Sequence, residues 1–381
     1  MGLTARKIDK VDNAAAAVDP RPAAHRRPGL DLLRALAILL VVLYHAGLFG
    51  FELPFDVQRF GWVGVDLFFV LSGYLIAGQL CARIARGDRP NLTVFYHRRA
   101  LRILPAYLVI VAIYFLLPAT WREYPTIPPL WKFLSFTQNL GLRGGTSFSH
   151  AWSLCIEAQF YLLLPFVILA LARKPRPLLI MLIPGMVLAG EVLIRATLAH
   201  VNASSPTPTF GWWQQWIYYP TYARLDSLTL GVSLAAMESF RPTWWAALLK
   251  TARWIWLPGL SAIVIALVLA KNGLSGMSSA VGFLLVAAGM GAFLICAVSP
   301  RLPFSRIAIP GAAFLATIAY SVYLSHKLAI HAVELLAANY SVPPIPAYGV
   351  MLLSILLAGA ALFFAIERPY LQMREEKKRR D

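Results

Sequence analysis

An arginine and a histidine stand eleven residues apart in one apolar stretch, LDLLRALAILLVVLYHAG. Eleven helical steps of about 100° return to within about 20° of the starting direction, so Arg34 and His45 would share one helix face, about 16 Å apart along the axis. Imidazole titrates near neutral pH and is a competent nucleophile, so His45 could act as a general base or accept an acyl group. The structural alternative is an arginine that snorkels to the surface and a histidine satisfied inside the bundle. The pair on one face favours catalysis.

Three carboxylates in other apolar stretches could orient this imidazole: Asp66, Glu157 and Asp226. Ionisable groups are costly in hydrocarbon, so they usually face the interior of a helix bundle and mark a pathway or site. Ser153 and Tyr161 flank Glu157 at four-residue steps, which predicts one polar stripe along a helix. A purely structural partnership with an arginine or a hydroxyl is the alternative for each acid.

Two features could hold a phosphorylated donor. Arg98, Arg99 and Arg102 directly precede the third apolar stretch, and guanidinium groups bind phosphates through paired hydrogen bonds. The same arginines could instead serve topology and anionic lipids. Ser72 and Gly73 could let a cofactor approach, or only permit close helix contact.

Aromatic and polar residues near the outer helix ends could bind an acceptor. The candidates are Trp152, Tyr161, Tyr222, Arg224, Trp212 and Trp213. An interfacial aromatic belt accounts for the tryptophans of 210–216 equally well. A later segment adds His326 as a catalytic candidate, but His326 and His331 would point about 140° apart, so neither a zinc pair nor any other metal site is expected.

Membrane helices must position these residues. The 381-residue chain is 59% apolar and 14% charged, with a mean hydropathy of +0.63. Soluble domains carry about 25% charged residues, so a single soluble core is excluded. Ten stretches approach the roughly 20 apolar residues that a bilayer-spanning helix needs, which predicts an all-α integral membrane bundle of about ten helices. The predicted spans are 30–50, 61–80, 103–120, 151–172, 177–199, 222–240, 254–270, 278–298, 311–335 and 347–366.

The basic residues predict the orientation of this bundle. The net charge is +17, which in a soluble chain would suggest nucleic acid; here the basic residues lie between spans, so membrane lipids rather than nucleic acid are the expected partners. With both termini cytoplasmic, inner segments hold 25 Lys and Arg residues and outer segments hold five. We predict a disordered basic cytoplasmic tail over 1–29, a membrane domain over 30–370 and a basic cytoplasmic tail over 371–381.

Several motifs in order resemble the membrane acyltransferase-3 family. They are Arg34 and His45 with ten residues between them, GVDLFFVLSGYLI at 64–76, RRALRILPAY at 98–107, HAWSLCIEAQFYLLLP at 150–165, RLDSLTLG at 224–231, YSVYLSH at 320–326 and IERP at 366–369. The resemblance covers about 30–370. It implies a bundle of about ten helices in the bacterial cytoplasmic membrane that moves an acyl group, commonly acetyl, from cytoplasmic acyl-CoA to a hydroxyl of an extracytoplasmic carbohydrate or glycolipid.

The resemblance also implies roles for particular residues. His45 would be the catalytic histidine, and Arg34 would help to handle the donor. The arginines at 98–102 would be candidates for the CoA phosphates. Glu157 matches the family glutamate after Trp-Ser-Leu, although 155–158 reads Cys-Ile-Glu-Ala where a second acidic residue is more usual. With no added hydrolase-like domain recognised, a self-contained transferase is the expected form.

Two other functions remain compatible with the residues themselves. A transporter or flippase for a lipid-linked saccharide would also need ten spans and a polar interior, but it would consume no thioester. A member of the other large family of membrane-bound O-acyltransferases would depend on the late His326 rather than on His45.

Overall fold

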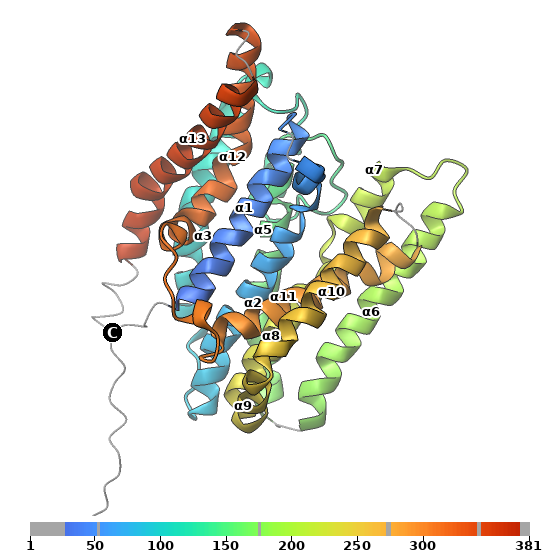
Figure 1. The fold of residues 1–381 in the computed structure, drawn as a ribbon, viewed down its shortest axis with the longest axis vertical. Helices are drawn as coiled ribbons and strands as arrows, with labels where there is room; N and C mark the ends of the chain where they lie inside the picture. Colours follow the sequence, from blue (N-terminus) through green and yellow to red (C-terminus); the bar gives the residue numbers. More distant parts are fainter. Residues whose placement is uncertain (1–26, 52–53, 174–176, 272–275, 341–343, 374–381) are drawn as a thin grey trace, which may run out of the picture.

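Figure 1 shows the computed structural model of the chain, which describes residues 27–51, 54–173, 177–271, 276–340 and 344–373. Within these ranges the chain forms helices, turns and irregular connections, and no strand. Most of the two predicted tails, 1–26 and 374–381, lies outside the described residues, so those predictions remain untested.

The described part contains nine helices that are long and apolar enough to cross a membrane, which confirms an all-α integral membrane protein. The long helices are α1 (Pro28–Leu48), α2 (Val63–Ala85), α3 (Leu92–Leu116), α5 (Trp152–Arg173), α6 (Pro177–Ala203), α10 (Ala252–Lys271), α11 (Gly276–Val298), α12 (Ala312–Tyr340) and α13 (Pro344–Leu362). Shorter helices are α4 (Leu130–Leu134), α7 (Phe210–Trp213), α8 (Asp226–Phe240) and α9 (Pro242–Lys250). The sixth predicted span, 222–240, is the short α8 of 15 residues.

Helix α3 begins eleven residues before the predicted span 103–120. The side chain of Asn91 caps it by accepting a hydrogen bond from the Val94 amide at 3.0 Å, which satisfies one of the open amides of a helix start. The arginines at 98–102, which directly precede the predicted span, therefore lie on the same helix as that span. An extension of a membrane helix beyond the hydrocarbon accommodates their charge.

The long helices pack around two apolar cores. In Figure 1, α12 and α13 lie side by side at one edge, while α6 lies at the opposite edge beyond α10 and α11. One apolar core joins α1, α3, α5, α12 and α13, and a second joins α2, α8, α10 and α11. Helices α1, α2, α3, α5 and α8 contribute residues to both cores, and α1 contacts α2.

Two glycines bring α2 and α8 into close contact. A Cβ atom at Gly73 would collide with the carbonyl oxygen of Leu228, and one at Gly231 would collide with that of Val70. Small residues allow this approach between membrane helices. Packing thus explains Gly73, whereas the adjacent Ser72 points into a cavity.

Candidate active site

Three histidines from distant parts of the chain meet inside the bundle. His45 lies near the end of α1, His150 lies in the 3-10 turn η3 (Ser149–Ala151), and His326 lies on α12. The His326 ring centroid lies 4.8 Å from that of His45 and 4.8 Å from that of His150. The His45 and His150 centroids are 5.9 Å apart. These residues, which we call the histidine cluster, are buried or half-buried.

Hydrogen bonds assign the protons on two of these rings. Nδ1 of His326 lies 2.8 Å from the Tyr323 carbonyl oxygen and Nδ1 of His45 lies 2.9 Å from the Val41 carbonyl oxygen. A carbonyl only accepts, so in the neutral rings both Nδ1 atoms carry the proton. Nε2 of His326 then has a lone pair, 3.1 Å from Nδ1 of His45. In this state Nε2 of His45 also has a lone pair, the form required of a base.

His45 and His150 line a cavity of about 640 Å³, the histidine cavity. Other lining residues include Tyr44, Tyr124, Trp152, Trp212, Gln215 and Tyr219. Burial and the neighbouring Glu123 carboxylate raise the pKa of the Tyr124 phenol, which therefore stays protonated at neutral pH. Amphipathic aromatic rings, phenols and amides together suit a ligand with apolar faces and many hydroxyl groups.

A buried carboxylate holds the surroundings of the histidine cluster in place. Glu123 accepts hydrogen bonds from the Phe148 amide and the Tyr114 hydroxyl, both at 3.0 Å, and lies 3.2 Å from Nζ of Lys327. Phe148 has a φ of +56°, a left-handed conformation that is unfavourable without glycine. This conformation directs the chain into η3, which carries His150.

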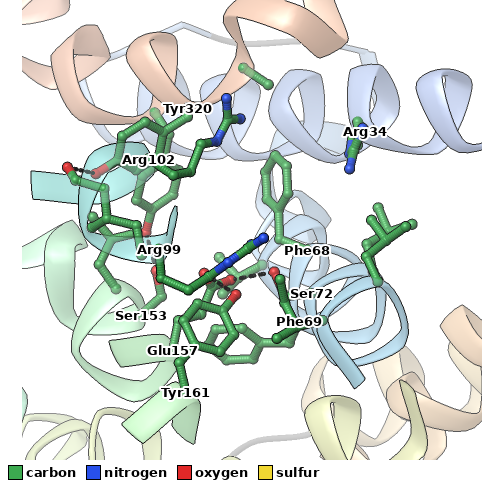
Figure 2. Close-up of a pocket in the computed structure, with 18 of the residues that line it drawn as sticks. Arg34, Phe68, Phe69, Ser72, Arg99, Arg102, Ser153, Glu157, Tyr161 and Tyr320 are labelled. Carbon is green, nitrogen blue, oxygen red and sulfur yellow. Dashed lines mark hydrogen bonds between the residues drawn. The ribbon is translucent and has the colours of Figure 1, made fainter. Parts of the chain in front are cut away.

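A second cavity, of about 370 Å³, lies among α1, α2, α3, α5 and α12. We call it the arginine cavity because Arg34, Arg99 and Arg102 line it together. Figure 2 shows Arg99 reaching toward Ser72, with Arg34 on the facing helix α1. The structure thus brings together Arg34 and two members of the 98–102 cluster, while Arg98 lines neither cavity.

Glu157 lies in the arginine cavity, not among the histidines. Its carboxylate accepts hydrogen bonds from the hydroxyls of Ser72 and Tyr161, both at 2.9 Å (Figure 2). Ser153, Glu157 and Tyr161 all line this cavity, as one stripe of α5. The seven residue steps from His150 to Glu157 correspond to about 10 Å along a helix, so the acid lies more than a helical turn away from His150.

Arg102 is held by a partner from the end of the chain. It forms an ion pair of 2.6 Å with Glu367, which also accepts a hydrogen bond from Ser321 at 2.7 Å. Glu367 belongs to a π-helical turn, η7 (Phe363–Glu367), and such turns are frequent at functional sites. The pairing links the IERP motif to the arginine cavity.

The two cavities meet at Val65 and Tyr323, which line both of them. Along α5 the boundary falls between two neighbours, because Trp152 lines the histidine cavity and Ser153 lines the arginine cavity. The arginines and the histidines thus occupy adjoining compartments in the interior.

The other two predicted acids are buried in ion pairs with arginines. Asp66 lies 3.0 Å from Arg224 and accepts a hydrogen bond from Ser227 at 3.0 Å. Asp226 binds Arg195 through two hydrogen bonds of 2.6 and 2.9 Å. Neither acid lines either cavity. His326, not a carboxylate, is the side chain that contacts Nδ1 of His45.

The predicted acceptor residues are dispersed. Trp152 and Trp212 line the histidine cavity, whereas Tyr161 lines the arginine cavity. Trp213 is buried and donates to Ser279 at 2.9 Å, and Tyr222 donates to the Trp216 carbonyl at 2.9 Å. Arg224 stacks on the Phe283 ring at 3.8 Å. These last three line neither cavity.

The residues predicted from the sequence do not include His150, Glu123 and Glu367. His150 opens the motif HAWSLCIEAQFYLLLP and is one of only seven histidines, so its rarity was a usable signal. Glu123 and Glu367 carry no comparable local pattern. Among the described residues, no group of three His, Cys, Asp or Glu side chains is arranged to hold a metal ion.

The sequence profile of the acyltransferase domain family matches residues 27–365. The chain belongs to the acyltransferase-3 family. Every residue that lines the two cavities falls within the matched range. Together with the nine long apolar helices, the bacterial relatives below identify an integral protein of the bacterial cytoplasmic membrane.

Curated relatives in this family include peptidoglycan O-acetyltransferase OatA of Listeria monocytogenes, 32% identical over 231 residues. O-acetyltransferase OatA of Staphylococcus aureus is 30% identical over 226 residues, and the putative peptidoglycan O-acetyltransferase YrhL of Bacillus subtilis is 32% identical over 226 residues. The alignments cover 55–56% of this chain but only 33–34% of each relative. The chain therefore spans about a third of the length of these relatives. No solved structure matches it.

Proposed function

We propose that this protein transfers an acyl group from cytoplasmic acyl-CoA to a hydroxyl of an extracytoplasmic carbohydrate or glycolipid. The acyl group we propose is acetyl. Membership of the acyltransferase-3 family supports acyl transfer. Relatives named as peptidoglycan O-acetyltransferases support acetyl as the group and a carbohydrate as the acceptor.

The arginine cavity is the proposed donor site. Acyl-CoA carries several phosphates, and Arg34, Arg99 and Arg102 supply planar guanidinium groups that suit them. Arg34 lies on the N-terminal half of α1 and His45 near its C-terminal end. If the basic segments are cytoplasmic, the arginine cavity lies on the side where acyl-CoA is made, and the histidine cavity lies toward the acceptor.

The arrangement of His45 and His326 carries the mechanistic proposal. His45 lines a cavity large enough for a sugar, and its Nδ1 proton is held between the Val41 carbonyl and Nε2 of His326. When Nε2 of His45 takes up a proton, both neighbours stabilise the resulting imidazolium. This is the geometry of a base with an orienting partner.

In the proposed step, Nε2 of His45 removes the proton of the acceptor hydroxyl while that oxygen attacks the thioester carbonyl carbon. A carbon–oxygen bond forms, and the carbon–sulfur bond breaks. The proton then passes from His45 to the departing sulfur, so the products are an O-acyl ester and CoA with a free thiol. His45 is regenerated neutral.

Reconstituted protein supplied with labelled acetyl-CoA and bacterial membrane extract tests the proposal. We expect the wild type to release the CoA thiol and to transfer label to a glycan or lipid fraction, and His45→Ala to release none. His200→Ala is the matched control, because His200 is an exposed histidine of α6 that lines neither cavity.

Full activity of His45→Ala would exclude this histidine as the base. No thiol release by the wild type with any acyl-CoA would favour the transport of a lipid-linked saccharide instead. Label trapped on His45 in the absence of acceptor would indicate that the imidazole carries the acyl group covalently.

A further inference from the structure

Within the described ranges, the two cavities share only two lining residues. Val65 of α2 and Tyr323 of α12 line both cavities, and each residue is 5% exposed. Phe68 and Phe69, on the next turn of α2, line the arginine side only. We call Val65 and Tyr323 the junction.

The hydroxyl group of Tyr323 fixes the ring in place, because it both donates and accepts a hydrogen bond. The hydroxyl donates to the His150 carbonyl at 2.5 Å. Its single proton is thereby used, so the Ser153 hydroxyl donates to the Tyr323 oxygen, at 2.6 Å. The ring also packs edge-on against Phe68, with centroids 6.3 Å apart. A side chain held in this way cannot move aside easily to admit a larger group.

The side chain of Val65, on the other side of the junction, is equally unable to move aside. A β-branched side chain on a helix has essentially one χ1 rotamer, and Val65 belongs to the packed apolar core shared with α1, α3, α5 and α12. The junction therefore joins a rigid aromatic ring to a rigid aliphatic side chain. On one side of it lies the cavity with the arginines, and on the other lies the cavity with His45.

We infer that the junction selects the length of the transferred acyl chain. This inference rests on the proposed function: a thioester whose CoA portion is held by the arginines must present its acyl carbonyl to His45 across Val65 and Tyr323. A short acyl group needs little room beside these side chains, whereas each added methylene must fit against them. The substrate class is therefore short acyl thioesters, and Val65 is a specificity-determining residue.

The expected size of this effect follows from other apolar pockets. One methylene that does not fit, or is missing, changes kcat/KM by about 10- to 200-fold. We expect the wild-type kcat/KM to fall by at least about 10-fold from acetyl- to propionyl-CoA and again to butyryl-CoA.

Two substitutions of opposite size test the assignment. Val65→Ala removes two methyl groups and should raise the butyryl-to-acetyl ratio of kcat/KM by about 10-fold or more. Val65→Ile adds one methylene and should lower the propionyl-to-acetyl ratio. Val111→Ala is the matched control: Val111 is a buried valine of α3 that lines neither cavity, so its loss should leave both ratios unchanged.

Release of the CoA thiol is the measurement for every protein and every thioester. If acetyl-CoA is turned over but neither Val65 variant changes the kcat/KM ratios between thioesters, chain-length selection at the junction is overturned. The proposed function then remains intact. Equal changes in the Val111 variant would assign the effect to general loosening of the core and would also overturn it. If the wild type consumes no thioester, the proposed function fails, and the junction fails with it.

Discussion

Nζ of Lys327 lies 3.2 Å from the Glu123 carboxylate, and both side chains are buried. Lys327 directly follows His326 on α12, while Glu123 also accepts the amide hydrogen of Phe148, two residues before His150. One ion pair therefore joins the two chain segments that bring His326 and His150 to His45.

Removal of Glu123 should destabilise the protein. Loss of one partner leaves the other charge buried and unpaired, which costs about 3–5 kcal/mol, and Phe148 loses the acceptor for its strained amide. We expect Glu123→Ala to lower the thermal midpoint in detergent, measured by loss of folded monomer. Glu334→Ala, which breaks the half-exposed pair with His331, should have little effect. An unchanged midpoint in Glu123→Ala would contradict this role.

His326 should act on the rate and not on donor binding. Without the acceptor at Nε2, the His45 ring loses one of the two groups that hold its Nδ1 proton. Because a general base contributes about 10²- to 10⁴-fold, we expect His326→Leu to reduce kcat by about 10- to 100-fold and to leave the KM for acetyl-CoA nearly unchanged. His326→Gln, which retains an acceptor, should recover part of the rate. Equal loss in both variants would refute an orienting hydrogen bond.

Neighbouring arginines on α3 provide a matched pair for the donor site. Arg99 lines the arginine cavity and Arg98 does not. Hydrogen bonds to charged groups contribute about 1.5–3 kcal/mol, so Arg99→Ala should raise the KM for acetyl-CoA by about 10-fold or more. Arg98→Ala should leave it within about twofold. Equal effects would instead point to a nonspecific attraction of anions to the basic surface, which higher salt would weaken.

Asp66 and Asp226 should contribute to stability and not to chemistry. Each is buried against an arginine and lines neither cavity. We expect Asp226→Ala to lower stability by about 3–5 kcal/mol through the uncompensated Arg195 charge, while the folded fraction keeps its kcat. The check is turnover per folded monomer, quantified after size-exclusion chromatography. A fall in kcat of more than about 100-fold at unchanged stability would restore the acid to the catalytic site.

Local sequence patterns predicted the helices well. Hydropathy found the spans, and helical periodicity alone placed Arg34 and His45 on one face of α1. Contacts between distant segments could not be predicted in the same way. His326 lies 281 residues from His45, and nothing near either residue encodes how α1 and α12 pack. For the same reason we expected Glu157 to orient the imidazole. Helix α5 instead places Glu157 in the arginine cavity.

Helix α8 rises about 22 Å over its 15 residues, whereas the hydrocarbon core of a bilayer is about 30 Å thick. No residue of α8 is exposed, because α2, α6 and α11 surround it. Its neighbours thus cover most of the short helix, which need not match the bilayer thickness itself. A segment of this length, with an acid near each end, is a poor candidate for independent insertion by the translocon. We expect its entry into the membrane during biosynthesis to depend on α2. Helix α2 is made earlier, and its Gly73 allows α8 to pack closely against it.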